Sequence, residues 1–153
     1  MKASTIQLTL AECRRRGWYC EKTETWNSFA KVRKDLLGFA DVLALPPDHS
    51  PLLIQTTTRD NAAARRTKIG GLETARLWLE GGGEIEVWTW AKRKREVDPN
   101  DRRRRKGVAQ WTLFVSGAVL SGQPFGEGAA MDIGPIEWVD VEEPVPTEVA
   151  CTQ

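Results

Sequence analysis

The chain has 153 residues, of which 41% are hydrophobic and 28% are charged, and its formal net charge is +1. These values are typical of one globular domain with a hydrophobic core, and they exclude a disordered or fibrous chain. No apolar run approaches the roughly 18 residues that a membrane-spanning helix needs, and the N-terminal segment carries Glu12 and three arginines where a secretory signal would be apolar. We therefore expect a cytoplasmic protein.

Few residues are available for metal or nucleophile chemistry based on histidine or cysteine. Cys13, Cys20 and Cys151 show no paired spacing of the kind that zinc sites use, and an odd number fits no closed disulfide framework. His49 is the only histidine and lies in a proline-rich turn, which leaves no material for a histidine-based triad. Any chemistry must come from carboxylates, amides, hydroxyls and basic groups.

Charge is unevenly distributed along the chain. Residues 1–106 contain all 22 Lys and Arg and 14 of the 21 Asp and Glu, a net charge of +8, whereas residues 107–153 contain seven acids and no basic group, a net charge of −7. A basic body suits a polyanionic partner, and an acidic tail can cover that body or keep the chain dissolved.

The first predicted element is a helix over residues 5–16. Its apolar residues recur among polar ones, and Thr9 with Glu12 three residues later has the pattern of a capping box. Gly17 is expected to end this helix.

Three strands are expected to follow. Residues 18–26 alternate apolar and charged side chains, as a half-buried strand does. Residues 36–45 are nearly all apolar around one acid, Asp41, which predicts a strand buried on both faces. After a proline-rich loop, residues 52–58 are rich in branched side chains and predict its antiparallel partner, so the two segments form a hairpin.

The second half begins with helical segments. Asp60 or Asn61 can cap a helix that begins at residue 62 and either continues or restarts over residues 72–80, until three glycines end it. Two strands are expected after it, over residues 84–92 and 108–120. The first has Ile85, Val87 and Thr89 on one face and Glu86, Trp88 and Trp90 on the other. Residues 1–120 then make the folded domain, and residues 121–153 make an irregular acidic tail rich in Gly and Pro.

One constellation of polar residues stands out. A hairpin would place Asp41 beside the middle of the following strand, and the i, i+2 relation puts Gln55 and Thr57 on one face of that strand. The side chains can thus converge. The surrounding residues that carry the pattern are Arg33, the segment Asp35 to Asp41 with sequence DLLGFAD, and Gln55, Thr56 and Thr57.

This pattern resembles the core of the PD-(D/E)XK nuclease superfamily, and it is most similar to phage and bacterial proteins that resemble Holliday-junction resolvases and VRR-type nucleases. The resemblance covers residues 5–95, including the order of the elements. It implies an α/β restriction-endonuclease-like αβββαβ core, in which helices flank a mixed central sheet, with an additional C-terminal strand.

The resemblance also implies a site for Mg²⁺ or Mn²⁺, which prefer hard oxygen ligands. Asp41 would be the principal ligand, with Gln55, the carbonyl of Thr56 and a third carboxylate, Glu12. The implied catalytic residues are Asp41, Gln55, Thr57 and Lys68.

Two positions depart from the family pattern. Gln55 stands where the family has an acid, so a dipole replaces a full charge at the metal, and Thr57 stands where the family has lysine. Arg65 and Lys68 on the following helix could supply a basic group instead.

Basic residues favour a nucleic-acid partner, most simply DNA. Residues 92–106 contain nine Lys or Arg, which form either a solvated loop or an arm that contacts phosphates. Trp88 and Trp90 are candidates for base stacking, although most tryptophans, such as Trp78, Trp111 and Trp138, are expected in the core. The candidate nucleic-acid contacts are Arg65, Lys68, Arg93, Arg102, Arg103, Arg104 and Arg105.

Structural roles remain open for the two candidate carboxylates. Asp41 could be a buried carboxylate satisfied by backbone groups or by Arg33, and Glu12 could serve only in a capping box.

Three functions remain open at this point. The first is a metal-dependent, resolvase-like endonuclease. A homodimer would suit this function, because its two-fold axis matches the symmetry of a duplex or junction. The second is a nuclease-fold protein that binds nucleic acid or a protein without cutting. The third is a small accessory protein of a phage or mobile element that contacts another protein through its acidic tail and exposed tryptophans.

Overall fold

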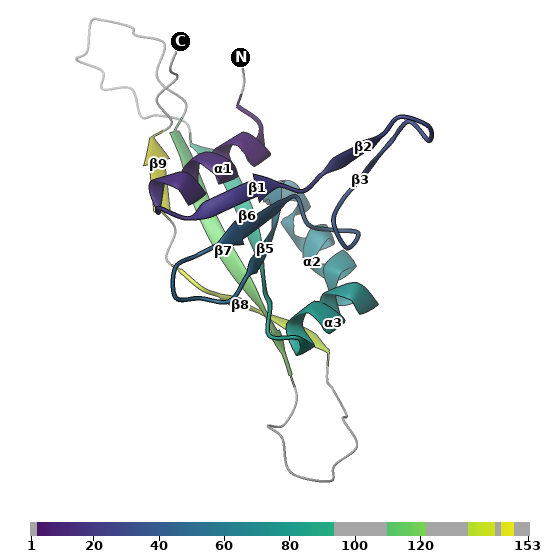
Figure 1. Cartoon of the computed structure of the whole chain (residues 1–153). Helices are drawn as coiled ribbons and strands as arrows, with labels where there is room; N and C mark the ends of the chain where they lie inside the picture. The colour runs from purple at the N-terminus through teal and green to yellow at the C-terminus, as the bar shows by residue number, and fades with distance from the viewer. Residues whose placement is uncertain (1–2, 94–109, 122–134, 143–144, 149–153) are drawn as a thin grey trace, which may run out of the picture.

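The computed structural model describes residues 3–93, 110–121, 135–142 and 145–148 (Figure 1). The helices are α1 (Thr5–Arg15), a short 3-10 turn η1 (Arg59–Asn61), α2 (Ala62–Gly70) and α3 (Glu73–Glu80). The strands are β1 (Tyr19–Lys22), β2 (Thr25–Asn27), β3 (Val32–Lys34), β4 (Val42–Leu45), β5 (Leu52–Thr58), β6 (Glu84–Arg93), β7 (Gln110–Leu120), β8 (Ile136–Asp140) and β9 (Val145–Glu148).

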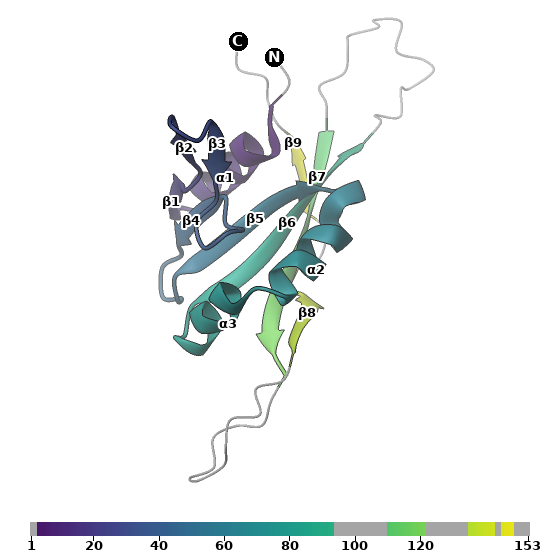
Figure 2. The ribbon, with the colours of Figure 1, turned by 90° about the vertical axis from the view of Figure 1, so that its right-hand side faces the viewer.

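The main sheet is mixed, and its strand order is β1-β4-β5-β6-β7-β8, with β9 also paired to β7. The strands β5 and β6 are parallel, and the other pairs are antiparallel. The helix α1 packs on one face of the sheet, and α2 and α3 pack on the other (Figure 2). The molecule is therefore an α/β fold in three layers, as the sequence predicts at this level.

Alternation along the central strands divides the core between the two faces. On the face under α1, the core contains Leu8 and Cys13 of the helix with Ile54, Trp88 and Trp90 of the sheet. On the other face, Phe39, Leu53, Ile69, Ala75 and Val87 are among the buried residues that join the sheet to α2 and α3. The odd-numbered residues of β5 and β6 thus face α2 and α3, and the even-numbered residues face α1.

Several predicted elements are confirmed, including the order of a helix, antiparallel strands, a helical region and a further strand in a mixed sheet. The predicted alternation of β6 is also confirmed. Of the two alternatives for residues 62–80, the structure has the restarted helix, because the chain turns at Gly71 between α2 and α3.

The capping box of α1 differs from the prediction. Ser4 is the N-cap, and its hydroxyl accepts a hydrogen bond from the Gln7 backbone N–H, while the Gln7 side chain accepts one from the Ser4 backbone N–H. Thr9 and Glu12 lie inside the helix and are buried. The helix begins a turn earlier than the Thr9 pattern suggests, because Ile6 and Leu8 both pack on the sheet.

The predicted strand over residues 36–45 is wrong for its first half. Only Val42–Leu45 is a strand, and residues 36–40 form a tight turn in which the backbones of Leu36 and Ala40 bond to each other. Leu37 and Gly38 have positive φ angles of 55° and 85°, which no strand accommodates. The segment is apolar because Phe39 and Ala40 are buried in the core, as parts of a turn.

The segment 18–26 contains two strands where one is predicted. The strand β1 pairs with β4 in the main sheet, whereas β2 pairs only with β3 and makes a hairpin that extends away from the body (Figure 1).

The predicted irregular tail is wrong for residues 136–140 and 145–148. These residues form β8 and β9, which pair with the two halves of β7. Pairing is favoured there because β7 would otherwise present a long unpaired edge, and Trp138 packs against the core of the α3 face.

Within the described ranges, no helix has the length and apolar character required to cross a membrane.

Candidate functional site

Asp41 lies directly before β4, where the 36–40 turn returns the chain to the sheet. Its backbone N–H donates to the carbonyl of Ile54 at 3.0 Å, and its own carbonyl accepts from the Thr23 N–H at 2.9 Å. These bonds fix Asp41 between β5 and the start of the hairpin. The residue is only 8% exposed.

The Asp41 carboxylate is held by donors from β5. Its Oδ2 accepts a hydrogen bond from the Thr56 backbone N–H at 2.9 Å and another from Nε2 of Gln55. The same Gln55 nitrogen donates to the Thr56 carbonyl at 3.2 Å. The amide nitrogen of Gln55 therefore bridges the Asp41 carboxylate and the Thr56 carbonyl.

Burial raises the pKa of the Asp41 carboxyl from 3.8 to about 6. The charges of Asp35 and Glu24 add to this increase, whereas the Thr56 N–H and the charge of Arg65 oppose it. The sum leaves a carboxyl that titrates close to neutral pH and lacks an ion pair with a basic side chain within the described residues.

The groups around Asp41 do not match the set of oxygen ligands that the resemblance implies for a metal. Asp41 and the Thr56 carbonyl are two of the expected oxygen ligands, but the nitrogen that bridges them carries hydrogens and cannot ligate a cation. The described residues also contain no group of three or more His, Cys, Asp or Glu side chains that could hold a metal ion. As the side chains lie here, one carboxylate faces an amide nitrogen where the resemblance implies a second oxygen ligand.

Buried polar atoms without partners continue from this site across the sheet. The Gln55 residue is 2% exposed, and the described residues give its Oε1 no hydrogen-bond partner, as is also true of Oγ1 in Thr89 and in Thr112. By strand alternation these three side chains and Thr57 lie on the face under α2. The Thr57 hydroxyl donates to the Thr58 carbonyl at 3.4 Å. A threonine side chain carries no basic group that could replace the lysine of the family pattern.

The two basic candidates on α2 differ in position. Arg65 is half-buried, and its charge acts on Asp41. Lys68 is exposed in the last turn of the helix, and no ion pair or hydrogen bond joins its side chain to Asp41. The structure brings together Asp41, Gln55 and Thr56, with the charge of Arg65 nearby.

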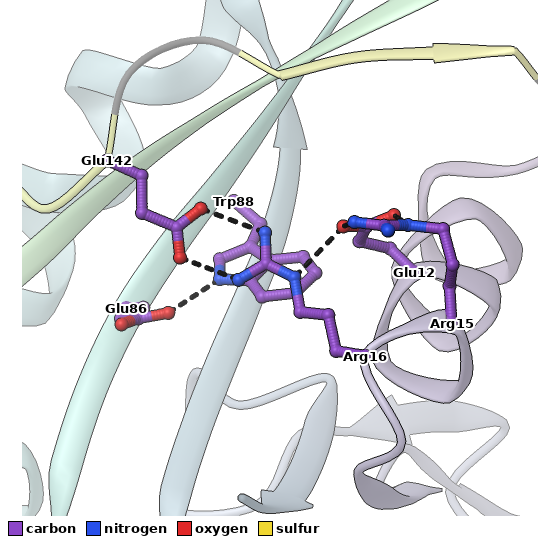
Figure 3. A network of polar contacts seen from close by, with 6 residues as sticks. All are labelled: Glu12, Arg15, Arg16, Glu86, Trp88 and Glu142. Carbon is purple, nitrogen blue, oxygen red and sulfur yellow. Dashed lines mark hydrogen bonds and ion pairs between the residues drawn. The ribbon is translucent and has the colours of Figure 1, made fainter.

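Glu12 belongs to a different cluster, on the face under α1 (Figure 3). Its carboxylate accepts hydrogen bonds from Arg15 at 2.7 and 2.8 Å and from Arg16 at 2.9 Å. Burial disfavours its charged form, but the two guanidinium groups hold the net pKa of Glu12 below its usual value. Its oxygens are occupied by arginines, and Gln55 points to the opposite face of the sheet.

Arg16 is the centre of this second cluster. Its guanidinium makes two bonds to Glu142, at 2.6 and 2.8 Å, and its carbon lies 5.1 Å from the ring centre of Trp18 and 4.9 Å from that of Trp88 (Figure 3). Because both carboxylates favour the charged form, the pKa of Arg16 is raised despite burial. The cluster fastens the segment after β8 to the end of α1.

Glu86 completes the cluster. Its carboxylate accepts a hydrogen bond from the Trp88 indole at 2.7 Å, and burial raises its pKa. No local sequence pattern indicates this cluster, because Arg16 and Glu142 lie 126 positions apart. The single local signal was Glu86 on the buried face of a strand, beside Trp88.

The stacking role expected for Trp88 and Trp90 is wrong. Both are buried, at 0% and 1% exposure, and the Trp90 indole donates to the Thr9 hydroxyl at 2.9 Å. Neither ring has a face free for a base.

The candidate Arg93 and a further arginine, Arg59, lie at the same edge of the sheet. The parallel register pairs Thr58 with Trp90, so Arg59 and Arg93 follow at the carboxyl ends of adjacent strands. Arg93 in turn pairs with Gln110, so the segment between these two residues leaves and returns at this edge. Arg102, Arg103, Arg104 and Arg105 lie outside the described residues.

Comparison with family models, with curated proteins and with solved structures finds no match to this chain.

Proposed function

We propose that the chain is a nucleic-acid-binding protein of nuclease-like architecture that binds without cutting. The observation that carries the proposal is the bridge that Gln55 Nε2 makes between the Asp41 carboxylate and the Thr56 carbonyl. In a metal-dependent nuclease a divalent cation between such oxygens activates water and neutralises charge on the phosphate. An amide nitrogen can hold the two oxygens together, but it cannot activate water in this way.

The order of elements supports the nuclease-like part of the proposal. A helix, the antiparallel strands β1, β4 and β5, and two helices that lead to the parallel strand β6 follow the αβββαβ order of the superfamily that the sequence resembles. The β2–β3 hairpin and the strands β8 and β9 are additions to that order.

The charge at one edge supports the binding part. Arg59, Lys92 and Arg93 are exposed at the carboxyl ends of β5 and β6. The sequence between Lys94 and Lys106, attached at the same edge, adds seven Lys or Arg and three acids. Such a concentration of positive charge favours phosphate contacts that do not depend on base sequence.

The proposal is tested by the salt dependence of binding to a labelled DNA duplex, measured by fluorescence anisotropy in EDTA. We expect log Kd to increase linearly with log salt. Replacing Arg102 to Arg105 with glutamine should reduce the slope by up to about 3.6, because each phosphate that an arginine neutralises contributes about 0.9 to it. Arg14→Gln, which removes an exposed charge from α1, is the control and should leave the slope nearly unchanged. Absence of binding at low salt, or equal slopes for the quadruple variant and wild type, would contradict the proposal.

A further inference from the structure

The hairpin of β2 and β3 has no partner in the main sheet. In the part of the chain that the structure describes, its two strands pair only with each other, and the hairpin extends away from the body (Figure 1). The Asn27 side chain holds the turn at its tip, because its Oδ1 accepts hydrogen bonds from the backbone N–H groups of Phe29 at 3.0 Å and Ala30 at 3.1 Å. The tip is thus an ordered turn at the end of an exposed arm.

Large apolar side chains are exposed on this arm. Phe29 in the turn is 100% exposed, Trp26 in β2 is 61% exposed, and Val32 in β3 is also exposed. Exposed aromatic residues that lie together on a short projecting element favour contact with another molecule, because exposed apolar patches often mark interaction sites.

The charge of the arm indicates which molecule. Between Thr25 and Lys34 the sequence contains Lys31, Arg33 and Lys34 and no acid. Glu24, at the base of the arm, pairs with Arg33 at 3.2 Å, and the described residues show no ion pair for Lys31 or Lys34. Aromatic rings beside positively charged side chains are complementary to a strand of nucleic acid, because its bases can stack on the rings and its phosphates are negative.

The base of the arm is joined to the Asp41 site. The Thr23 hydroxyl donates to the Ala40 carbonyl at 2.8 Å, and the Thr23 N–H donates to the Asp41 carbonyl at 2.9 Å. After β3 the chain enters the 36–40 turn directly, so both strands of the arm end beside Asp41. A ligand along the arm would therefore approach this site.

We propose that the β2–β3 hairpin binds nucleic acid by stacking Phe29 and Trp26 on unpaired bases, with Lys31 at the tip and Arg33, which lies across from Trp26, on the adjacent phosphates. This inference rests on the proposed function and adds the form of nucleic acid that is preferred. Bases in single strands and at branch points have accessible faces, whereas those inside a linear duplex are stacked on each other. The hairpin therefore selects single-stranded or branched substrates.

The test measures the Kd of three labelled DNA probes, a single strand, a four-way junction and a linear duplex, by anisotropy. Phe29→Ala and Trp26→Ala should each weaken binding of the single strand and the junction by roughly 5-fold to 100-fold, since one base stacked on an aromatic ring contributes that much. Binding of the duplex should change by less than about 3-fold. Phe29→Trp, which keeps a ring, should restore the affinity.

Leu77→Ala is the matched control, because Leu77 is 55% exposed on α3 and lies outside the arm. If wild type binds none of the probes, both the proposed function and this inference fail. If wild type binds and the hairpin variants bind as Leu77→Ala does, the inference fails and the proposed function stands. An equal loss on all three probes would overturn stacking on unpaired bases. Thermal unfolding of every variant establishes that losses are not due to misfolding.

Discussion

At the scale of single residues, Asp41 and Gln55 decide what the site can do. The sequence identified both positions and the side chains' convergence, because a hairpin and an i, i+2 spacing are local patterns. It could not show that Gln55 presents its nitrogen to Asp41, because the direction of an amide depends on every polar atom around it. The pair is now best described as a carboxylate held by neutral donors.

The Asp41 carboxyl makes stability depend on pH. Because its pKa of about 6 in the folded protein is above the ordinary 3.8, the folded state holds the proton more tightly than the unfolded chain does. The stabilising contribution is complete below about pH 4 and is lost as the pH rises through 6. Relative to Asp41→Asn, the free energy of unfolding of wild type should decrease by up to about 3 kcal/mol between pH 4 and pH 7.

Urea denaturation at both pH values measures this difference. Asp60→Asn changes an exposed carboxylate and is the control. A difference between wild type and Asp41→Asn that is the same at pH 4 and pH 7 would contradict this prediction, because it would mean that folding does not raise the pKa of Asp41.

Gln55→Glu should create a metal site at Asp41. Without metal, two buried carboxylates would face each other, so the variant should unfold at lower temperature than wild type. Mg²⁺ or Mn²⁺ should raise its melting temperature, and a metal at 100 times its Kd would add about 2.7 kcal/mol. Wild type should show no such response. Gln55→Met, which removes the amide and adds no charge, is the control and should be destabilised without a response to metal. An equal metal response in wild type would mean that Gln55 already serves as an oxygen ligand.

At the scale of elements, a buried chain of hydroxyls and an indole joins α1 to the sheet. The Thr9 hydroxyl donates to the Thr56 hydroxyl at 3.0 Å and accepts from the Trp90 indole at 2.9 Å. The helix is therefore positioned by polar bonds from β5 and β6 as well as by its apolar face.

Thr9→Val keeps the shape of this residue and removes its hydroxyl. The Trp90 N–H and the Thr56 hydroxyl would then be buried without a partner, which should lower the free energy of unfolding by about 2 to 4 kcal/mol. Thr9→Ser keeps the hydroxyl and should cost about 1 kcal/mol for the lost methyl group. Chemical denaturation distinguishes the two, and equal stabilities for the valine and serine variants would contradict the role of these bonds.

The elements also show where sequence reasoning succeeds. Strands with clear alternation, such as β6, were predicted because burial on two faces leaves a local pattern. The turn at residues 36–40 leaves no such pattern. A run of apolar residues has the same composition in a buried turn as in a buried strand, so its sequence does not distinguish the two. The strands β8 and β9 were missed because they are short and because they form by pairing with β7, a long-range property.

At the scale of the whole molecule, the C-terminal region is part of the fold. Besides the pairing of β8 and β9, the two bonds between Arg16 and Glu142 connect this region to α1. Deletion of residues 122–153 would remove strands together with acidic charge. A test of the protein-partner alternative should therefore change acidic side chains and keep the strands.

The central claim, binding without metal-dependent cutting, is tested most directly by incubating the purified protein with labelled branched and linear DNA in Mg²⁺, Mn²⁺ or EDTA, beside Asp41→Ala. We predict that wild type binds in all three conditions, leaves the DNA intact, and matches Asp41→Ala in affinity. Cutting that requires Mg²⁺ or Mn²⁺ and is lost in Asp41→Ala would contradict this account and establish an active nuclease.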